Sequence, residues 1–234
     1  MKKTNLFDVL SWLLVLSTLA SAFYFYDILP PKVVTHWNFQ GVPDGYSSKA
    51  VGAFLVPALS VFMLILFYFL PKLDPKRKNY QEFLKDYKAI QLVIIFFFTA
   101  LHFITNFGNK EFTEMVKSCL SCQGFYIPLT AVPSLITATI GFMFVIIGLY
   151  LKNIKPNWFV GIRTPWTLSN DEVWKQTHKY GGKVFVLSGL LFMSLGFLPD
   201  SWSLPMFILI IALILSSIVY SYLLYQKQKK QPKE

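Results

Sequence analysis

The sequence predicts an all-α fold, a polytopic membrane helix bundle with six transmembrane helices and both termini in the cytoplasm. Three observations predict it. Of the 234 residues, 54% are hydrophobic and only 15% are charged. The hydrophobic residues fall in runs of about 20, roughly the length of helix that crosses a hydrocarbon core of about 30 Å. The loops between the runs alternate between many and few basic residues, which is typical of a multi-pass membrane protein.

Six hydrophobic runs are long enough to be spans. We expect them to be helical, because a segment in lipid has to satisfy its own backbone hydrogen bonds and the runs lack the short alternation of a barrel strand. The fifth run is only about 22 Å long at 1.5 Å per residue, so its helix is expected to start earlier or Lys183 to snorkel. The predicted spans are 9–26, 51–70, 90–107, 129–151, 184–198 and 204–224.

The distribution of the 22 Lys and Arg residues predicts the topology. With both termini inside, the inner segments hold eighteen of them, and the outer loops hold only Lys32, Lys49, Lys110 and Lys117. Because this is the positive-inside pattern, the basic charge is a topology signal and does not indicate direct nucleic-acid binding. The first span follows the N-terminal lysines without a clear cleavage site, which predicts a retained signal anchor.

Glycines predict one helix contact in the second half of the chain. Gly141 and Gly148 lie seven residues apart on one helical face of the fourth span, and Gly189 and Gly196 do so in the fifth. Small residues at this spacing let two helix backbones approach closely. We expect the two spans to pack together, although glycine is also common in membrane helices for other reasons.

The first outer loop, residues 29–50, combines a stiff chain with exposed polar and aromatic groups. Pro30 and Pro31 end the first span, and the run from Val42 to Gly45 has the proline and glycine positions of a turn. Aromatic side chains on a rigid loop make a recognition surface, and they equally fit the aromatic belt at the headgroup level. The residues that the loop presents are His36, Trp37, Asn38, Asp44, Tyr46 and Lys49.

Polar residues also lie within the third span. His102 has Thr99 one turn before it and Asn106 one turn after it on the same face. An ionisable group inside a span is a candidate for function, and His102, His36 and Asp44 are residue types that bind metals. Because their spacing matches no metal motif, we predict no metal and no cofactor, and a packing histidine whose hydrogen bonds are satisfied.

The two cysteines, Cys119 and Cys122, form a C-x-x-C in the second outer loop. A single pair cannot be a disulfide framework for the whole fold. No second pair accompanies the motif, so it is weak as a signal for zinc or redox chemistry, and local pairing on an oxidising outer face stays open.

The inner loop between the fourth and fifth spans carries the clearest local signal. The run from Ser169 to Glu172 matches a capping box and Gly181 matches a helix stop, which predicts a short helix of about eleven residues before the fifth span. We expect one stripe of this helix to lie in the inner headgroup layer or against the bundle. The stripe carries Asp171, Trp174 and His178, with Thr177 beside them.

Upstream of that helix, the run GIRTPW places Arg163 between a glycine and a proline. Its guanidinium suits a lipid phosphate, a partner carboxylate or the end of a helix dipole. Anchoring at the inner interface, together with Trp158, Trp166 and Trp174, explains the same residues equally well. The sequence holds no nucleophile elbow, no H-E-x-x-H and no phosphate-binding glycine loop, so we do not expect an enzyme.

Together the two loops resemble known families. LPPKVVTHWNFQGVPDGYSSK resembles the outer-loop motif of a widespread domain of unknown function, and NWFVGIRTPWTLSNDEVWKQTHKYGG resembles the signature of the SdpI family. The resemblance implies an N-terminal membrane half at 1–110 and an SdpI-like half at 111–234. The outer binding residues that it implies are His36, Trp37, Asn38, Gly41, Pro43, Asp44, Tyr46 and Lys49. The inner ones are Gly161, Ile162, Arg163, Thr164, Pro165, Trp166, Trp174, Thr177 and His178.

The resemblance also implies a function. It points to a bacterial plasma-membrane protein that gives immunity to, or senses, a secreted toxic peptide outside and signals to a transcriptional repressor inside. The partners are then the lipid bilayer, the peptide and the repressor, with no direct nucleic acid. The alternative is a membrane transporter or membrane enzyme with an outer polar site around His36 and His102. The lack of an internal repeat and the scarcity of charge within the spans disfavour that alternative.

Overall fold

The computed structural model of the protein describes residues 5–117 and 131–230. Within those ranges six helices are long and apolar enough to cross a membrane, which confirms the predicted all-α bundle of six spans. The C-x-x-C motif lies outside the described residues. The six helices are α1 (Leu6–Ile28), α2 (Lys49–Leu73), α3 (Leu84–Lys117), α4 (Val132–Leu151), α6 (Asp171–Ser194) and α7 (Ser203–Lys229).

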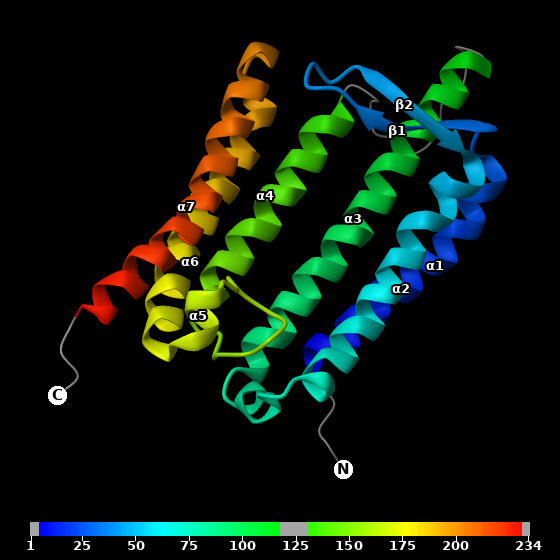
Figure 1. The fold of residues 1–234 in the computed structure, drawn as a ribbon. Helices are drawn as coiled ribbons and strands as arrows, with labels where there is room; N and C mark the ends of the chain where they lie inside the picture. Colours follow the sequence, from blue (N-terminus) through cyan, green and yellow to red (C-terminus); the bar gives the residue numbers. More distant parts are fainter. Residues whose placement is uncertain (1–4, 118–130, 231–234) are drawn as a thin grey trace.

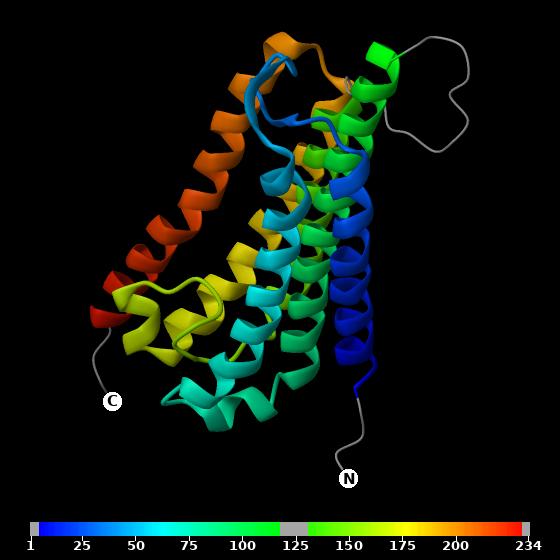
Figure 2. The ribbon, with the colours of Figure 1, turned by 90° about the vertical axis from the view of Figure 1, so that its right-hand side faces the viewer.

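The helices form two groups of three (Figure 1). In the first group α1, α2 and α3 contact one another; in the second α6 packs against α4 and α7; and α3 joins the groups by packing on α4. Because six crossings return the chain to its starting side, α1 begins and α7 ends at the same end of the bundle (Figure 2). We call this the inner end and the opposite one the outer end, following the predicted topology.

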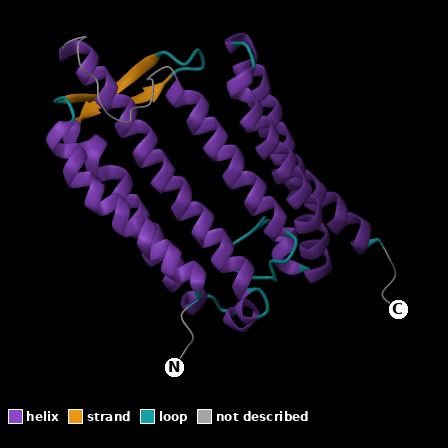
Figure 3. Ribbon diagram, turned by 180° about the vertical axis from the view of Figure 1, so that it is seen from behind, coloured by secondary structure: helices purple, strands orange, loops and turns teal. Residues whose placement is uncertain are grey.

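A β-hairpin, which was not predicted, lies across the outer end of the helices (Figure 3). Strands β1 (Lys32–Trp37) and β2 (Pro43–Ser48) are antiparallel. The prediction of a turn at Val42 to Gly45 was wrong, because Pro43 already pairs with Trp37 in the ladder. The chain reverses earlier instead, where the Asn38 carboxamide oxygen accepts the backbone N–H of Val42 at 3.0 Å and Gly41 has a φ of 71°.

The predicted short inner helix and the fifth span are one helix, α6. Its start is one residue later than predicted: Asn170, not Ser169, is the N-cap and accepts the amide of Glu172 at 2.9 Å. The predicted stop at Gly181 was also wrong, since the helix continues to Ser194. The expectation that the fifth span starts earlier than its hydrophobic run is therefore confirmed.

Glycines bring α4 and α6 into backbone contact, as predicted. A Cβ atom built on Gly148 would lie 2.7 Å from the carbonyl oxygen of Gly182, and one built on Gly189 would lie 2.5 Å from that of Gly141. The partner of Gly148 is thus Gly182 and not one of the two predicted α6 glycines, and Gly196 lies against the first turn of α4 instead. Gly182 sits inside a helix because this close approach needs a residue without a side chain.

The largest cluster of buried apolar residues lies toward the inner end and joins the two groups of helices. It draws side chains from α2, α3, α4, α6 and the connecting loops, so that the loops are part of the packed interior. Its buried members are Phe67, Tyr80, Phe83, Tyr87, Ile90, Leu151, Ile154 and Trp174.

Candidate functional site

The hairpin presents a hydrogen-bonded His–Asp pair to solvent at the outer end. The Nδ1–H of His36 donates to Asp44 Oδ1 at 2.5 Å, and 70% of the histidine side chain is exposed. A Cβ atom on Gly45, which lies opposite His36 in the ladder, would come within 2.6 Å of the histidine Cβ. The missing side chain at Gly45 therefore leaves the room in which His36 reaches Asp44 from the neighbouring strand.

Two lysines at the outer end lie over tyrosine rings. The ammonium group of Lys32 lies 4.8 Å from the centre of the Tyr46 ring, and that of Lys49 lies 4.4 Å from the Tyr26 ring of α1. The indole N–H of Trp37 is buried and has no hydrogen-bond partner among the described residues. The predicted outer residues thus occupy one hairpin, apart from Lys49, which begins α2, and His36, Asp44 and Tyr46 are exposed.

The hairpin is fixed to α3 by Asn109, which sequence analysis did not single out. Its carboxamide accepts the backbone N–H of Val34 at 2.7 Å and donates to the Val34 carbonyl at 2.9 Å, so it extends the ladder of β1 as a strand would. Val34 and Asn109 are only 3% and 2% exposed. Because a two-stranded hairpin alone is marginally stable in water, this docking is what holds the outer surface in place.

Replacing Asn109 by alanine is expected to release the hairpin from α3, because both polar backbone groups of Val34 lose their partner in a buried place. Amide exchange in β1 should speed up at least about tenfold. Hydrogen exchange with mass spectrometry on the peptide spanning β1 measures this. Gln40→Ala at the exposed hairpin tip is the matched control and should leave the exchange of β1 unchanged; unchanged exchange in the Asn109 variant would show that β1 is held elsewhere.

His102 belongs to the interior and not to the outer surface. It is fully buried, its Nε2 lies 3.0 Å from the Ser21 hydroxyl of α1, and its Nδ1 lies 3.2 Å from the Asn106 carboxamide nitrogen. Since an amide N–H can only donate, Nδ1 accepts and Nε2 carries the proton that goes to Ser21. The predicted packing histidine with satisfied hydrogen bonds is confirmed, and His102 shares no site with His36 and Asp44 in the described structure.

The tip of the hairpin reaches the second group of helices. The ring of Phe39 lies 5.6 Å from that of Phe207 on α7, and a Cβ atom on Gly41 would lie 3.7 Å from the Pro133 ring at the start of α4. Phe39 is nevertheless 47% exposed. The hairpin therefore touches the outer ends of both halves of the molecule while leaving apolar side chains open.

At the inner end, a buried carboxylate that the sequence analysis missed holds the two inner loops together. Asp74, at the end of α2, is only 2% exposed. Its Oδ2 accepts the hydroxyl of Tyr80 at 3.0 Å and the backbone N–H of Trp158 at 2.8 Å. Burial and the adjacent Asp74 raise the pKa of Tyr80, so the phenol keeps the proton that it donates. Asp74 thus joins the loop after α2 to the loop after α4.

Asn157 organises the second of these loops from within. It is fully buried, and its Oδ1 accepts the backbone N–H groups of Phe159 and Val160 at 2.9 and 2.7 Å. Its Nδ2 donates to the carbonyls of Lys155 and Val160 at 2.9 Å each. A single side chain therefore replaces the hydrogen bonds that water would make with a tight turn.

His178 of α6 holds the backbone of the predicted GIRTPW run by a hydrogen bond. Its Nε2 accepts the backbone N–H of Ile162 at 3.0 Å, so the proton sits on Nδ1, which donates to the Trp174 carbonyl at 2.8 Å. The imidazole also stacks on Trp174 with 4.1 Å between ring centres. Gly161, with a φ of 115°, lies against this ring, where a Cβ atom would collide with Nε2. Of the two predicted places for the stripe, the packed one is confirmed for Trp174, Thr177 and His178, whereas Asp171 is exposed.

The next residues form a short helix, α5 (Pro165–Ser169), whose cap was not predicted. Thr164 and Thr167 cap it reciprocally: each hydroxyl accepts the other's backbone N–H, at 3.2 and 2.9 Å. The Thr164 hydroxyl also lies 3.1 Å from that of Ser221 on α7. The ring of Trp166 packs 5.0 Å from that of Tyr222, also on α7. The inner loop is thereby fixed to the last span.

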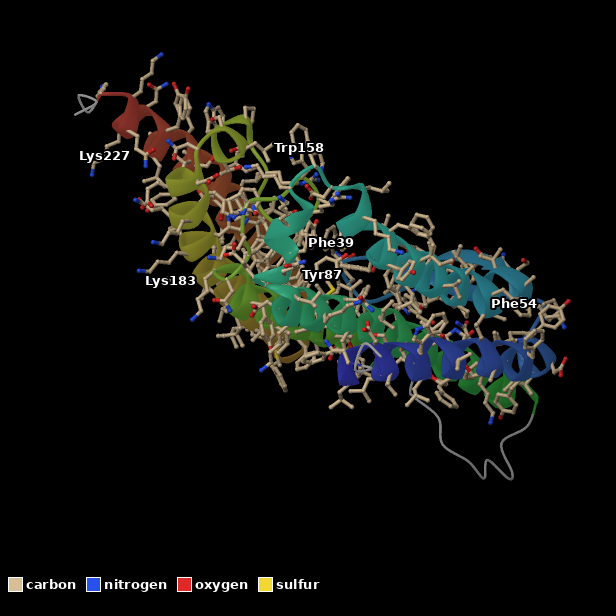
Figure 4. The ribbon with its side chains drawn as sticks, turned by 90° about the horizontal axis from the view of Figure 1, so that it is seen from below. Phe39, Phe54, Tyr87, Trp158, Lys183 and Lys227 are labelled. Atoms are coloured by element: carbon tan, nitrogen blue, oxygen red, sulfur yellow. The ribbon has the colours of Figure 1, made fainter. Side chains whose placement is uncertain are left out.

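Two large side chains of this loop, those of Arg163 and Trp158, are exposed. The guanidinium of Arg163 donates to the Trp158 carbonyl, and the residue is otherwise exposed, with no ion pair among the described residues. Trp158 is 51% exposed and lies at the inner surface (Figure 4). By contrast Thr177 is fully buried, and its hydroxyl has no hydrogen-bond partner among the described residues. Of the predicted inner residues, Gly161, Arg163 and Pro165 are exposed, and Arg163 together with the neighbouring Trp158 offers the large side chains that a partner could reach.

Fold and site define a polytopic helical membrane protein with an ordered surface at each end, a hairpin outside and a hydrogen-bonded loop inside. The SdpI/YfhL protein family model matches residues 153–221, and the model of a domain of unknown function, DUF1648, matches residues 12–61. The resemblance to the SdpI family is thus confirmed, and the chain is a multi-pass protein of the bacterial plasma membrane.

Two relatives come from Bacillus subtilis (strain 168). The chain is 23% identical over 221 residues to the protein called Immunity protein SdpI, which covers 94% of this chain and 96% of the relative. It is 29% identical over 93 residues to Uncharacterized protein YfhL, which covers 38% of this chain and 82% of that relative. No solved structure matches the chain significantly. The family matches include the outer hairpin and the inner loop.

Proposed function

We propose that this protein is a non-catalytic membrane receptor of the immunity type, whose outer hairpin binds a secreted peptide. The proposal rests chiefly on the exposed face of the hairpin. Three large apolar side chains stand open there, Phe39 at 47%, Val42 at 54% and Tyr46 at 49%. Exposed aromatic groups on a scaffold that is already ordered lose little entropy on binding. The similarity over nearly the full length to a protein called Immunity protein SdpI supports the same proposed function.

The ligand class follows from the chemistry of that face. Apolar side chains flank the His36–Asp44 pair, so the surface suits a peptide with an apolar stripe and at least one basic group facing Asp44. A peptide that inserts into the outer leaflet would meet the hairpin at the depth where its own apolar stripe lies. We therefore propose an amphipathic, membrane-active peptide as the ligand.

We further propose that binding is passed to the inner loop along α7 and the contact between α4 and α6. Phe39 of the hairpin contacts Phe207 near the outer end of α7. About 21 Å further along that helix, at 1.5 Å per residue, Ser221 contacts Thr164 of the inner loop. A rigid helix held at both ends moves as a unit, so a shift of the hairpin alters the loop. A cytoplasmic partner, for which a transcriptional repressor is the candidate, would then meet Arg163 and Trp158.

A resistance assay tests the proposal. The chain is expressed in a Bacillus subtilis strain from which Immunity protein SdpI has been deleted, and the cells are exposed to the secreted peptide fraction of the parent strain. The wild-type chain should raise the tolerated dose. Phe39→Ala combined with Tyr46→Ala should reduce that protection at least about tenfold, because two exposed anchor residues are lost.

Phe197→Ala is the matched control for this assay. Phe197 is 90% exposed beyond the end of α6 but does not belong to the hairpin, so its replacement should leave protection intact. Membrane levels of all variants are compared by immunoblot. If the hairpin variant protected as well as the wild type at equal levels, the hairpin would not be the peptide site. Arg163→Ala should keep peptide binding and lose only the signal to a partner.

The transporter or membrane-enzyme alternative requires His36 and His102 around a common polar cavity. In the described structure His102 is fully buried, and its ring packs at 5.4 Å from Phe25 and 5.3 Å from Phe103. His36 is exposed on the hairpin and bonds to Asp44. No observation in the described residues favours this alternative.

A further inference from the structure

A basic groove lies between α6 and α7 toward the inner end, outside the inner loop described above. It has a volume of about 460 Å³ and is open to the surroundings of the bundle. Its floor includes Tyr180 and Tyr220, stacked with 4.3 Å between ring centres. The residues that line it are Glu172, Lys175, Gln176, Lys179, Tyr180, Lys183 and Tyr220.

Three of the lining residues are lysines spaced four apart on one side of α6. Lys175, Lys179 and Lys183 are all exposed, and none takes part in an ion pair between described residues. The one carboxylate in the lining, Glu172, accepts a hydrogen bond from Gln176 at 2.7 Å. The groove therefore holds a net positive charge that the described residues leave unbalanced.

The lysine stripe ends at the depth of the membrane boundary. Gly182, next to Lys183, packs against Gly148, which lies one turn before the end of α4 at Leu151. Lys183 is therefore about one turn, or roughly 5 Å, deeper than the end of that span. One turn beyond Lys183 on the same face comes Leu187, which is 47% exposed. The stripe thus changes from ammonium groups to an apolar side chain where a phospholipid changes from head group to acyl chain.

We propose that this groove binds the head-group phosphate of an anionic phospholipid of the inner leaflet, with an acyl chain against Leu187. Lys179 and Lys183 supply the charge, and the hydroxyl of Tyr180, which lies 3.0 Å from that of Ser216, is placed at the groove floor. Basic pockets between spans on the cytoplasmic side suit such head groups. In the view from the inner end, Lys183 points away from the bundle (Figure 4).

Native mass spectrometry of the purified full chain in detergent tests this site with three probes. They are dioleoyl phosphatidylglycerol, dioleoyl phosphatidylcholine and inorganic phosphate. Phosphatidylglycerol should bind at least about tenfold more tightly than phosphatidylcholine. Replacing Lys179 and Lys183 together by glutamine should lower its affinity about tenfold or more. Replacing both by arginine should retain binding, which separates loss of charge from loss of fold.

The matched control removes two lysines from the same end of the protein outside the groove. Lys227 and Lys229 are exposed in the last turn of α7, and Lys227 lies apart from Lys183 in Figure 4. Their joint replacement by glutamine should change the affinity by less than about twofold. If both double glutamine variants lost affinity equally, the lipid would be bound by diffuse surface charge and not by the groove. Binding of inorganic phosphate as tight as that of phosphatidylglycerol would overturn the lipid assignment.

Discussion

Gly148→Leu is expected to destabilise the protein strongly through the contact between α4 and α6. A Cβ atom there already lies 2.7 Å from the Gly182 carbonyl oxygen and 2.8 Å from the backbone nitrogen of Val186. Because both neighbours are backbone atoms of a helix, a larger side chain forces the two helices apart. We expect a loss of about 3 kcal/mol or more, which is a fall of about 6 to 12 °C in apparent Tm.

Thermal unfolding in detergent, followed by intrinsic fluorescence, measures this loss. Gly148→Ala should give a smaller fall than leucine, since its single methyl group meets the same atoms with less bulk. Leu149→Ala is the neighbouring control, because Leu149 is 53% exposed on the same helix; it should stay within about 0.5 kcal/mol of wild type. If leucine at position 148 left the Tm unchanged, the helices would not be in backbone contact.

Asp74→Ala is expected to have the second large effect, at the inner end. The replacement leaves the Trp158 backbone N–H without its acceptor and removes the nearer acceptor of the buried Tyr80 hydroxyl, whose other acceptor is Asn157 Oδ1 at 3.3 Å. An unsatisfied buried donor costs about 1 to 3 kcal/mol, so the loss of both hydrogen bonds should lower the free energy of unfolding by about 3 kcal/mol. Asp74→Asn should be intermediate, because one carboxamide oxygen can replace only part of the acceptors.

The readout combines thermal unfolding with limited proteolysis of the inner loop. Loss of the carboxylate should expose the loop after α4 to cleavage before the spans unfold. Asp171→Ala is the matched control, because that carboxylate is exposed and its ion pair with Lys76 has a separation of 3.7 Å. An exposed pair of this kind contributes little. Equal protease sensitivity in the Asp74 variant and wild type would contradict the role given to Asp74.

The spans could be predicted from the sequence because lipid imposes a simple requirement. A helix in a bilayer must be long and apolar, and both properties can be counted along the chain. The contact between α4 and α6 was predictable for a similar reason, since only glycine permits backbone contact. Which glycine of α6 meets which glycine of α4 could not be predicted, because Gly182 follows a polar stretch and was not assigned to the span.

The hairpin could not be predicted because its strands do not have the usual composition of strands. β2 reads PDGYSS, and proline, aspartate and glycine are depleted in strands. It pairs with β1, which Asn109, about 75 residues further along the chain, docks on α3. The true turn at Asn38 also competes in the sequence with the later Pro-Asp-Gly run. Tertiary contacts, and not local sequence preferences, determine both the strands of the hairpin and the position of its turn.

The inner site was only partly predictable. Trp174 and His178 were correctly placed on one stripe, because helical spacing shows it, but the sequence left open whether the stripe faces the head groups or the bundle. Asp74 looked like an ordinary loop charge, since nothing near it in the sequence reveals that Tyr80 and Trp158 fold over it. The Thr164–Thr167 cap was missed because a threonine takes the place of the usual Glu or Gln of a capping box.

The continuity of α6 limits which lengths of chain this protein tolerates. His178 below the inner loop and Gly182 and Gly189 against α4 are all set on one helix, so their mutual angles are fixed by residue number alone. One residue inserted between His178 and Gly182 would rotate the imidazole by about 100° relative to the glycine face. The number of residues between His178 and the two glycines is therefore fixed by the contacts at both places, whichever side chains lie between them.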